Sequence, residues 1–301
     1  MKKLIQITLD YGKMVKFSHT LFALPFAGLS FVSALAETNK TPSELQRILF
    51  LIVLCMFSAR NAAMGFNRWA DRKIDALNPR TKDREIPKGV ISEKSVLFFV
   101  VGFCVLFILS SYFINFLCFL LSFPTLGIIL FYSYTKRFTY LCHYVLGLGI
   151  GIAPMGAYLS VTEYFSLPPI LWSFGLMLHI AGFDILYSTQ DIEIDKTIEM
   201  KSIPVKFGIL YALLISKLTH AICFILFLFA GFTAGLGVWY YTFLGITGIL
   251  LIVEHLLVSP RNMKRLPIAF FHINASISII LFIGIFLDKW SIVLSKLGIM
   301  I

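Results

Sequence analysis

The sequence predicts an all-α integral membrane protein, a bundle of about nine transmembrane helices with two aspartate-rich motif loops on its cytoplasmic side. The 301 residues are 58% hydrophobic and only 14% charged, whereas about a quarter of the residues in a soluble domain are charged. Long apolar runs recur along the chain, and basic residues alternate between the connecting loops. We therefore expect a single polytopic membrane domain, residues 1–301, without a soluble appendage.

Nine apolar runs are long enough to cross a membrane. A hydrocarbon core about 30 Å thick requires about 20 apolar residues in helical conformation. The third and fourth runs are separated by a single residue, so the sequence leaves open whether they form one helix or two. The nine runs cover residues 17–36, 45–66, 95–113, 115–133, 141–161, 168–187, 210–230, 234–257 and 268–287.

The basic residues predict the orientation of these helices. Most of the 26 lysines and arginines lie in the N-terminal segment and in the loops after the second, fourth, sixth and eighth runs. The positive-inside rule then places the N-terminus in the cytoplasm and the C-terminus outside the cell (inner) membrane. The net charge of +10 therefore indicates orientation in a lipid bilayer, and nucleic acid is not an expected partner.

Two acidic clusters with the same internal spacing follow the second and sixth runs. Side chains four residues apart share one face of a helix, so each pair of aspartates projects together. Facing each other, two such pairs would form an oxygen-rich site of the kind that holds Mg²⁺ against a diphosphate. The clusters are Asn67-x-x-x-Asp71-x-x-x-Asp75 and Tyr187-x-x-x-Asp191-x-x-x-Asp195.

The two loops also repeat an Ile-Pro pair followed by lysine and glycine, at 86–89 and 203–208. This repeat indicates an internal duplication, and such repeats commonly place the functional site at their interface. The alternative is that short loops share the same turn residues by chance.

One charged residue lies inside the apolar run that precedes each cluster. Arg60 lies seven residues before Asn67, and Asp184 lies seven residues before Asp191. Each is therefore about two helical turns deeper in the membrane, on the same helix face as its cluster. Charged groups inside a span mark a substrate path or an ion pair. Both are therefore candidate catalytic residues, and a purely structural pair between them is the alternative.

Basic residues near both clusters favour a phosphate ligand. Carboxylates bind the metal, the metal bridges phosphate oxygens, and cationic side chains take up the remaining charge. The rival function is a cation- or proton-coupled transporter, which would carry its acids in the middle of the spans and would gain nothing from basic loops. The candidates for holding a diphosphate are Lys73, Arg84, Lys136, Arg137, Lys201 and Tyr187.

The pair of motifs resembles that of the UbiA-type family of intramembrane aromatic prenyltransferases. The usual motifs of that family are N-D-x-x-D-x-x-x-D and, after a tyrosine, D-x-x-x-D. Arg68 is the one departure, because it stands where many members have the first aspartate. The resemblance covers the whole chain, includes the nine-helix topology, and extends to Arg60, Tyr134-Thr135-Lys136-Arg137, Asp184 and Lys201-Ser202.

The resemblance implies Mg²⁺-dependent transfer of a polyprenyl group from a polyprenyl diphosphate to an aromatic quinone precursor, with 4-hydroxybenzoate as the first expected acceptor. The segment 19–27 and the Asn67-Arg68 start are similar to a branch associated with menaquinone made by the futalosine route. A dihydroxynaphthoate is therefore the alternative acceptor. Asp184 is implied as a base or acceptor-orienting group, and Arg60 as a ligand at the deeper end. The implied Mg²⁺ ligands are Asp71, Asp75, Asp191 and Asp195, assisted by Asn67.

Polar residues elsewhere in the spans are expected to be structural. Asn274 must find a hydrogen bond inside the bundle. Glu254 is expected to reach the membrane surface or to pair with Arg261. The histidines other than His19 show no metal-ligand spacing and are expected to pack in helices or to bond main-chain groups: His143, His179, His220, His255 and His272.

Overall fold

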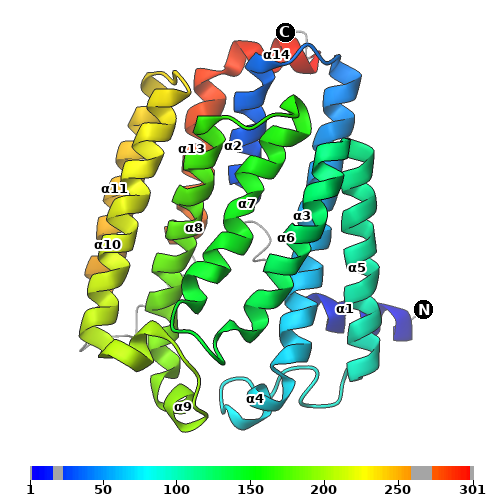
Figure 1. Ribbon diagram of the computed structural model, residues 1–301, viewed down its shortest axis with the longest axis vertical. Coiled ribbons are helices and arrows are strands. Elements are labelled where there is room, and N and C mark those ends of the chain that lie inside the picture. Colours follow the sequence, from blue (N-terminus) through cyan, green and yellow to red (C-terminus); the bar gives the residue numbers. More distant parts are fainter. Residues whose placement is uncertain (1, 16–22, 259–272, 299–301) are drawn as a thin grey trace.

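The structure is a computed structural model that describes residues 2–15, 23–258 and 273–298. Every regular element in these ranges is a helix, as predicted, and most of the helices run side by side in one bundle (Figure 1). The long helices are α3 (Pro42–Ala70), α5 (Glu93–Ile114), α6 (Phe116–Thr135), α7 (Cys142–Thr162), α8 (Leu167–Ser188), α10 (Ile203–Thr233) and α11 (Val238–Leu257). The shorter elements are α1 (Lys2–Val15), α2 (Leu24–Ala34), η2 (Leu35–Glu37), α4 (Arg72–Leu77), η3 (Thr189–Asp191), α9 (Ile192–Thr197), α13 (Asn274–Asp288) and α14 (Trp290–Leu297).

The chain is a multi-pass membrane protein. Within the described ranges, seven helices are long and apolar enough to cross a membrane, or eight if α13 and α14, bent by 78° at their junction, count as one span. The first predicted run coincides in part with α2 and η2, which are shorter than a span, and residues 17–22 lie outside the described ranges. The count of nine therefore stays a prediction.

The adjoining third and fourth runs form two separate helices. Asn115 lies between α5 and α6 with an extended backbone, and its side-chain oxygen accepts a hydrogen bond from the N–H of Cys118 at 2.8 Å. Such a cap starts a new helix because it satisfies a main-chain donor that has no partner within the helix. The break is thus encoded by a single polar residue.

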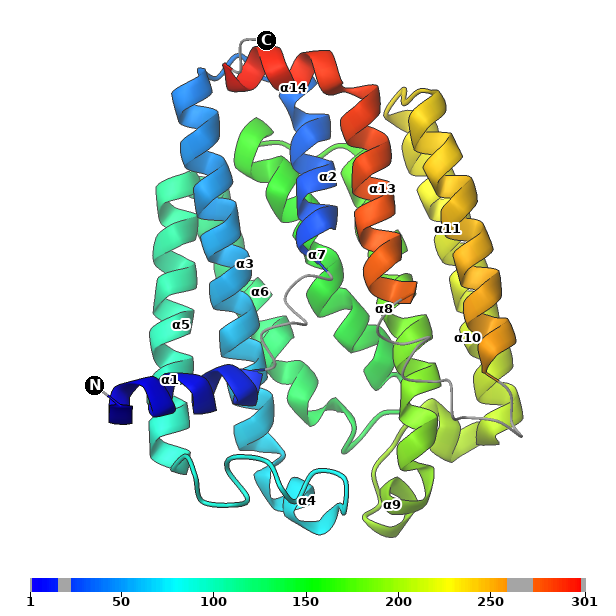
Figure 2. The same cartoon turned by 180° about the vertical axis from the view of Figure 1, so that it is seen from behind.

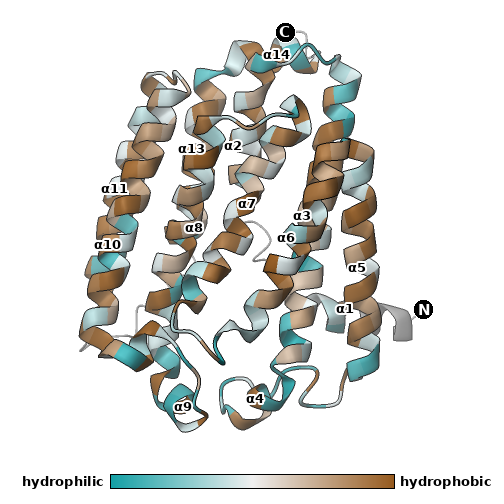
Figure 3. Ribbon diagram, in the orientation of Figure 1, coloured by the Kyte–Doolittle hydropathy of each residue, from teal (hydrophilic) through white to brown (hydrophobic). Residues whose placement is uncertain are grey.

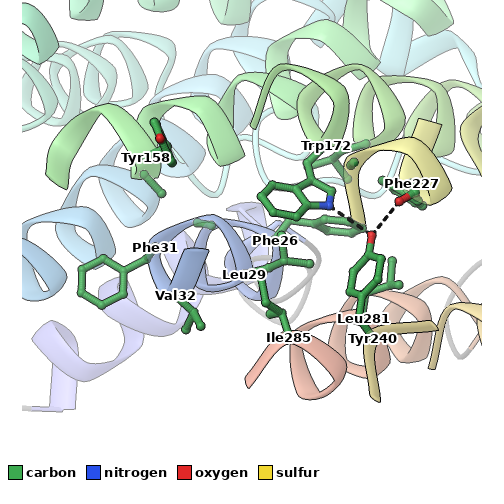
Figure 4. Packing of buried hydrophobic residues seen from close by; sticks show 14 of the residues in the cluster. Phe26, Leu29, Phe31, Val32, Tyr158, Trp172, Phe227, Tyr240, Leu281 and Ile285 are labelled. Atoms are coloured by element: carbon green, nitrogen blue, oxygen red, sulfur yellow. Dashed lines mark hydrogen bonds between the residues drawn. The ribbon is translucent and has the colours of Figure 1, made fainter. Parts of the chain in front are cut away.

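Hydrophobic side chains from several helices fill the core, with polar atoms paired inside it. Figure 4 shows Phe26 of α2 packed beside Trp172, Phe227 and Tyr240. The indole N–H of Trp172 donates to the Tyr240 hydroxyl at 3.1 Å, and that hydroxyl donates to the main-chain oxygen of Phe227 at 2.8 Å. Because lipid offers no alternative partner, these bonds tie α8, α10 and α11 together.

Helices α7 and α8 approach each other closely because α7 carries glycines at the contact. A Cβ at Gly147 would lie 2.1 Å from the main-chain oxygen of Met177, and one at Gly151 would lie 2.7 Å from that of Ser173. Small residues at such interfaces allow helix backbones to pack in van der Waals contact. This contact fixes the spacing between the two helices that carry His143 and Asp184.

The two ends of the bundle differ. The short helices α4 and α9 lie together at one end, and α14 lies at the other end near the C-terminus (Figure 1). Hydrophilic residues are concentrated at the end that carries α4 and α9, whereas the middle of the bundle is mainly apolar (Figure 3). The aspartate clusters therefore sit at one polar end of the bundle.

Helix α1 lies across the long helices rather than along them (Figure 2). Its Met14 and Val15 are buried against residues of α5 and of the loop before α5. The Nε of Arg68 donates to the main-chain oxygen of Met14 at 3.2 Å, and the hydroxyl groups of Tyr11 and Ser95 are 2.6 Å apart. Helix α1 is thereby bonded to both α3 and α5.

Candidate active site

A polar cavity of about 360 Å³ opens where α3, α6, α7 and α8 meet the loop after α4. It contains both intramembrane charges that the sequence singled out, together with the first aspartate pair. Cations outnumber acids along its wall, as a site for an anionic ligand requires. The charged residues that line it are Arg60, Arg68, Asp71, Asp75, Arg80, Arg84, Lys136 and Asp184.

The first cluster is held at the junction of two helices. Asp71 ends α3, and α4 begins at the next residue, so Asp75 follows one turn later. Asn67 Nδ2 donates to Asp71 Oδ2 at 3.1 Å, and Arg84 Nη1 lies 2.6 and 2.7 Å from the two carboxylate oxygens of Asp75. Arg137 Nη2 is 3.5 Å from Asp71 Oδ1. Burial, with the nearby charge of Asp75, raises the pKa of Asp71.

The second cluster follows α8 in the same manner, on η3 and α9. Arg80, from the loop after α4, donates from Nε to Asp191 Oδ1 at 3.0 Å and from Nη2 to Oδ2 at 2.6 Å. The same guanidinium group donates to the Tyr187 hydroxyl at 3.4 Å. Asp195 is buried, and its Oδ2 has no hydrogen-bond partner among the described residues. Arg80 therefore joins the loop that follows the first cluster to the second cluster.

The positive charge of Lys136 interacts with aspartates of both clusters. It follows the last residue of α6 and lines the polar cavity. Burial alone would lower the pKa of Lys136, but the charges of Asp195, Asp184 and Asp71 raise it above its usual value. Its ammonium group is thus kept protonated between the two acidic clusters and the deeper carboxylate.

Arg60 and Asp184 line the same cavity without forming the ion pair that was the structural alternative. The Nε of Arg60 is buried without a hydrogen-bond partner, and no described acid forms a salt bridge with Arg60. Asp184 instead contacts His143, whose Nδ1 lies 2.6 Å from Asp184 Oδ2. A guanidinium group that lines a cavity without an acid partner is suited to bind an anionic ligand there.

The remaining intramembrane polar residues form a separate buried group. His220 Nδ1 lies 3.0 Å from His255 Nε2, and His220 Nε2 lies 3.1 Å from the main-chain oxygen of His179. Asn274 donates to Glu254 at 3.1 Å, which confirms its expected hydrogen bond. Glu254 is fully buried, so the expectation that it reaches the surface is wrong: the histidine and asparagine side chains hold it inside the bundle. Arg261 and His272 lie outside the described residues.

Three of the predicted diphosphate ligands, Lys73, Arg137 and Lys201, do not line the cavity. Lys73 is exposed on α4. Lys201 donates its main-chain N–H to the main-chain oxygen of Lys136 at 2.7 Å, and its ammonium group lies 3.4 Å from the oxygen of Phe138. The other three, Arg84, Lys136 and Tyr187, line the cavity. Arg137 contacts Asp71, which lines it.

Sequence reasoning missed two residues of the site, Arg80 and His143. Arg80 lies in the basic loop after the second run, and its position five residues after Asp75 places it near the first cluster. His143 was expected to have at most a main-chain partner; it has one, the N–H of Ile203 at 3.3 Å, but it also bonds Asp184. No spacing rule connects residues on different helices, so that contact had no signal.

The candidate ligands fit a magnesium ion that the protein shares with a bound phosphate group, rather than an ion enclosed by protein ligands alone. Among the described residues, no three histidine, cysteine or acidic side chains converge on one point. Mg²⁺ in proteins is commonly held by one or two carboxylates, with substrate phosphates and water completing the shell. The two aspartate pairs and the unpartnered Asp195 oxygen fit that arrangement.

A second cavity of about 550 Å³ adjoins the polar one and is almost wholly apolar. It extends between α3, α5, α6, α7 and α8 toward the opposite end of the bundle, where Ile114 and Cys118 line it. The two cavities share wall residues: Met56, Ala59, Ile129, Gly149 and Ala153. Together they fit an amphiphilic molecule with an anionic head and a long apolar tail.

Known proteins are similar to this chain in sequence and in fold. Residues 23–284 match the model of the UbiA prenyltransferase family. The chain is 31% identical over 293 residues to a 4-hydroxybenzoate octaprenyltransferase of Yersinia pseudotuberculosis, covering 96% of this chain and 95% of that protein. It is 30% identical over 243 residues to the Nitrosomonas eutropha protein of the same name, covering 80% and 84%.

Two solved structures show the same fold. The apo structure of a UbiA homologue from Aeropyrum pernix K1 superposes with a TM-score of 0.81 at 29% identity, covering 90% of this chain and 98% of that one. A UbiA homologue from Archaeoglobus fulgidus, bound to GPP and Mg²⁺, superposes with a TM-score of 0.63 at 22% identity, covering 92% and 99%.

Proposed function

Because the chain belongs to the UbiA prenyltransferase family, we propose that it transfers a polyprenyl group from a polyprenyl diphosphate to an aromatic quinone precursor, with 4-hydroxybenzoate as the first acceptor to test. The observation that carries this proposal is the junction of the two cavities. The polar one offers cations and aspartates to a diphosphate, and the 550 Å³ apolar one accommodates a prenyl tail. The relatives named 4-hydroxybenzoate octaprenyltransferase support the acceptor.

The diphosphate binds at the polar end, between the two clusters. Arg80, Arg84, Lys136 and Arg137 take up its charge, with Tyr187 beside Arg80 and with Lys73 and Lys201 farther out. Asp71, Asp75, Asp191 and Asp195, assisted by Asn67, are the proposed ligands of Mg²⁺. When bound, Mg²⁺ neutralises the leaving group and so favours cleavage of the allylic C–O bond. The Archaeoglobus neighbour with GPP and Mg²⁺ supports this assignment.

The aromatic acceptor lies deeper, between Arg60 and Asp184. A carboxylate on the acceptor would supply the anion that the buried Arg60 guanidinium lacks among the described residues. A ring carbon attacks the allylic carbon, a C–C bond forms as the C–O bond to diphosphate breaks, and the ring proton passes to Asp184. This geometry requires an acceptor with an acid group at one end and an activated ring at the other.

The same placement supports the proposed orientation in the membrane. Helices α4 and α9, with the basic loops around them, lie at one end of the bundle and α14 at the other (Figure 1). The proposed arrangement in the cell (inner) membrane has the aspartate clusters and the N-terminus on the cytoplasmic side and the C-terminus outside. Both substrates then reach the site from the bilayer and the cytoplasm.

The test is transfer by the full chain in membranes. Octaprenyl diphosphate is supplied with 4-hydroxybenzoate, a dihydroxynaphthoate or haem, with Mg²⁺ or EDTA, and both released diphosphate and prenylated product are measured. Mg²⁺-dependent product with 4-hydroxybenzoate is expected, and Asp71→Asn and Asp191→Asn should each abolish it. Full activity of either variant would refute the metal assignment, whereas product only from the naphthoate would reassign the acceptor.

A further inference from the structure

Both ring nitrogens of the buried His143 are engaged, and their partners determine where its proton lies. Nε2 accepts a hydrogen bond from the main-chain N–H of Ile203 at 3.3 Å. A main-chain N–H can only donate, so Nε2 carries no proton. The ring proton of His143 therefore lies on Nδ1, which is 2.6 Å from Asp184 Oδ2.

This proton assignment determines the role of one oxygen of Asp184. With Nδ1–H as the donor, Oδ2 of Asp184 is the acceptor, and this hydrogen bond favours the carboxylate form. Its other oxygen, Oδ1, has no hydrogen-bond partner in the part of the chain that the structure describes, and Asp184 lines the polar cavity. One oxygen is thus anchored and the other is left for a ligand.

We propose that His143 is a positioning residue for the transfer reaction: it holds Asp184 ionised, with one oxygen fixed, so that the other oxygen accepts the proton of the acceptor. This inference rests on the proposed function and deepens it. A base that is anchored through one oxygen by a buried imidazole keeps its orientation when the cavity fills. His143 touches neither substrate nor metal ligand in this arrangement.

The second hydrogen bond of His143 connects the base to the diphosphate end. Ile203 begins α10, directly after the segment that follows Asp195. In that segment, Lys201 donates its main-chain N–H to the main-chain oxygen of Lys136 at 2.7 Å, and the Cys142 thiol lies 3.5 Å from the oxygen of Lys201. The imidazole is therefore wedged between the deep carboxylate and the loop of the second cluster.

Substitution of His143 by asparagine or by glutamine distinguishes its two hydrogen bonds, the one to Asp184 and the one to Ile203. The side-chain amide of asparagine places its nitrogen near the position of Nδ1, whereas that of glutamine extends to the position of Nε2. His143→Asn therefore retains a donor for Asp184 and loses the acceptor for Ile203. His143→Gln retains the acceptor for Ile203 and loses the donor for Asp184. A positioning role requires the first bond, and a purely structural role requires the second.

The experiment measures kcat and KM for both substrates with wild type, the two variants and Asp184→Ala, in the full chain in membranes. We expect His143→Gln to lower kcat by about 100-fold with little change in KM for the prenyl diphosphate, and His143→Asn to stay within about tenfold of wild type. In the Asp184→Ala background, His143→Gln should have no further effect, because its partner is absent. Equal losses in both variants, or an additive loss in that background, would overturn the inference.

A second measurement does not depend on turnover. The ¹⁵N chemical shifts of the His143 imidazole, assigned by their absence in His143→Asn, report which nitrogen is protonated in the resting protein. Protonated Nδ1 and unprotonated Nε2 are expected, and the opposite tautomer would reject the inference even if transfer is normal. If the wild type transfers to none of the acceptors, the proposed function fails, and these shifts still decide the proton position on His143.

Discussion

The guanidinium group of Arg80 donates hydrogen bonds to both carboxylate oxygens of Asp191, at 3.0 and 2.6 Å, although the two residues are 111 positions apart in the sequence. This contact joins the loop of the first cluster to the second cluster. It also places a cation on a proposed metal ligand. A diphosphate that enters between the clusters therefore meets a guanidinium group that Asp191 already holds in place.

Replacing Arg80 by lysine should weaken substrate binding more than turnover. Lysine keeps the charge but loses the fork that matches two oxygens, so KM for the prenyl diphosphate should rise about tenfold with kcat nearly unchanged. Steady-state kinetics at saturating Mg²⁺ measures both constants. Arg72→Lys is the matched control, because Arg72 pairs with Glu93 at 2.8 Å and does not line the cavity. Similar behaviour of the two variants would argue against a role for Arg80.

Replacing Arg60 by glutamine should affect only acceptors that carry a carboxylate. Loss of a buried charge-assisted contact costs about 1.5–3 kcal/mol, so KM for 4-hydroxybenzoate should rise about 10- to 100-fold. Phenol, which lacks the carboxylate, serves as the comparison acceptor and should respond to the substitution by less than about threefold. If both acceptors lose equally, Arg60 acts on the diphosphate instead.

The contact between α7 and α8 predicts a difference between two glycines of one helix. A methyl group at Gly147 would meet the main-chain oxygen of Met177, whereas one at Gly156 would meet nothing within 4 Å. Gly147→Ala should destabilise the protein by about 1–3 kcal/mol because a backbone must shift. Gly156→Ala should leave stability unchanged or raise it by up to about 1 kcal/mol. Thermal unfolding in detergent compares them, and equal midpoints would contradict the close packing.

The far end of the apolar cavity should limit the length of the prenyl tail. Cys118 lines that end, so Cys118→Phe fills space that only a long tail needs. We expect kcat/KM to fall about tenfold for octaprenyl diphosphate and to change little for geranyl diphosphate. Leu120→Phe, at an exposed position on the same helix, is the control. Equal losses for both tail lengths would place the tail elsewhere.

Local patterns in the sequence predicted the frame of this site well. The spacing of Asp71 and Asp75, and of Asp191 and Asp195, predicted that each pair follows a long helix, and it does; each pair, however, spans a break, with Asp75 on α4 and Asp195 on α9. Arg60 and Asp184 line one cavity because charges inside a membrane must face the bundle interior. The break at Asn115 agrees with the two separate runs on either side of it.

Contacts between helices could not be predicted in this way. The loop after α3 offers several basic residues with similar surroundings in sequence, yet Arg80 and Arg84 reach acids whereas Lys73 is exposed. Their difference arises from how α4 and its loop fold back, which depends on packing rather than on spacing. The contact of His143 with Asp184 likewise exists because α7 and α8 pack closely at Gly147.

Arg68 couples position 68 to helix α1. The family motif expected from the sequence has an aspartate there, but in this chain Arg68 donates to the main-chain oxygen of Met14 and thereby secures α1. Aspartate would leave that oxygen without its donor and would add a third acid beside Asp71 and Asp75. We therefore expect changes at position 68 and in α1 to be non-additive, so stabilisation of this enzyme by family consensus should omit this position unless α1 is exchanged with it.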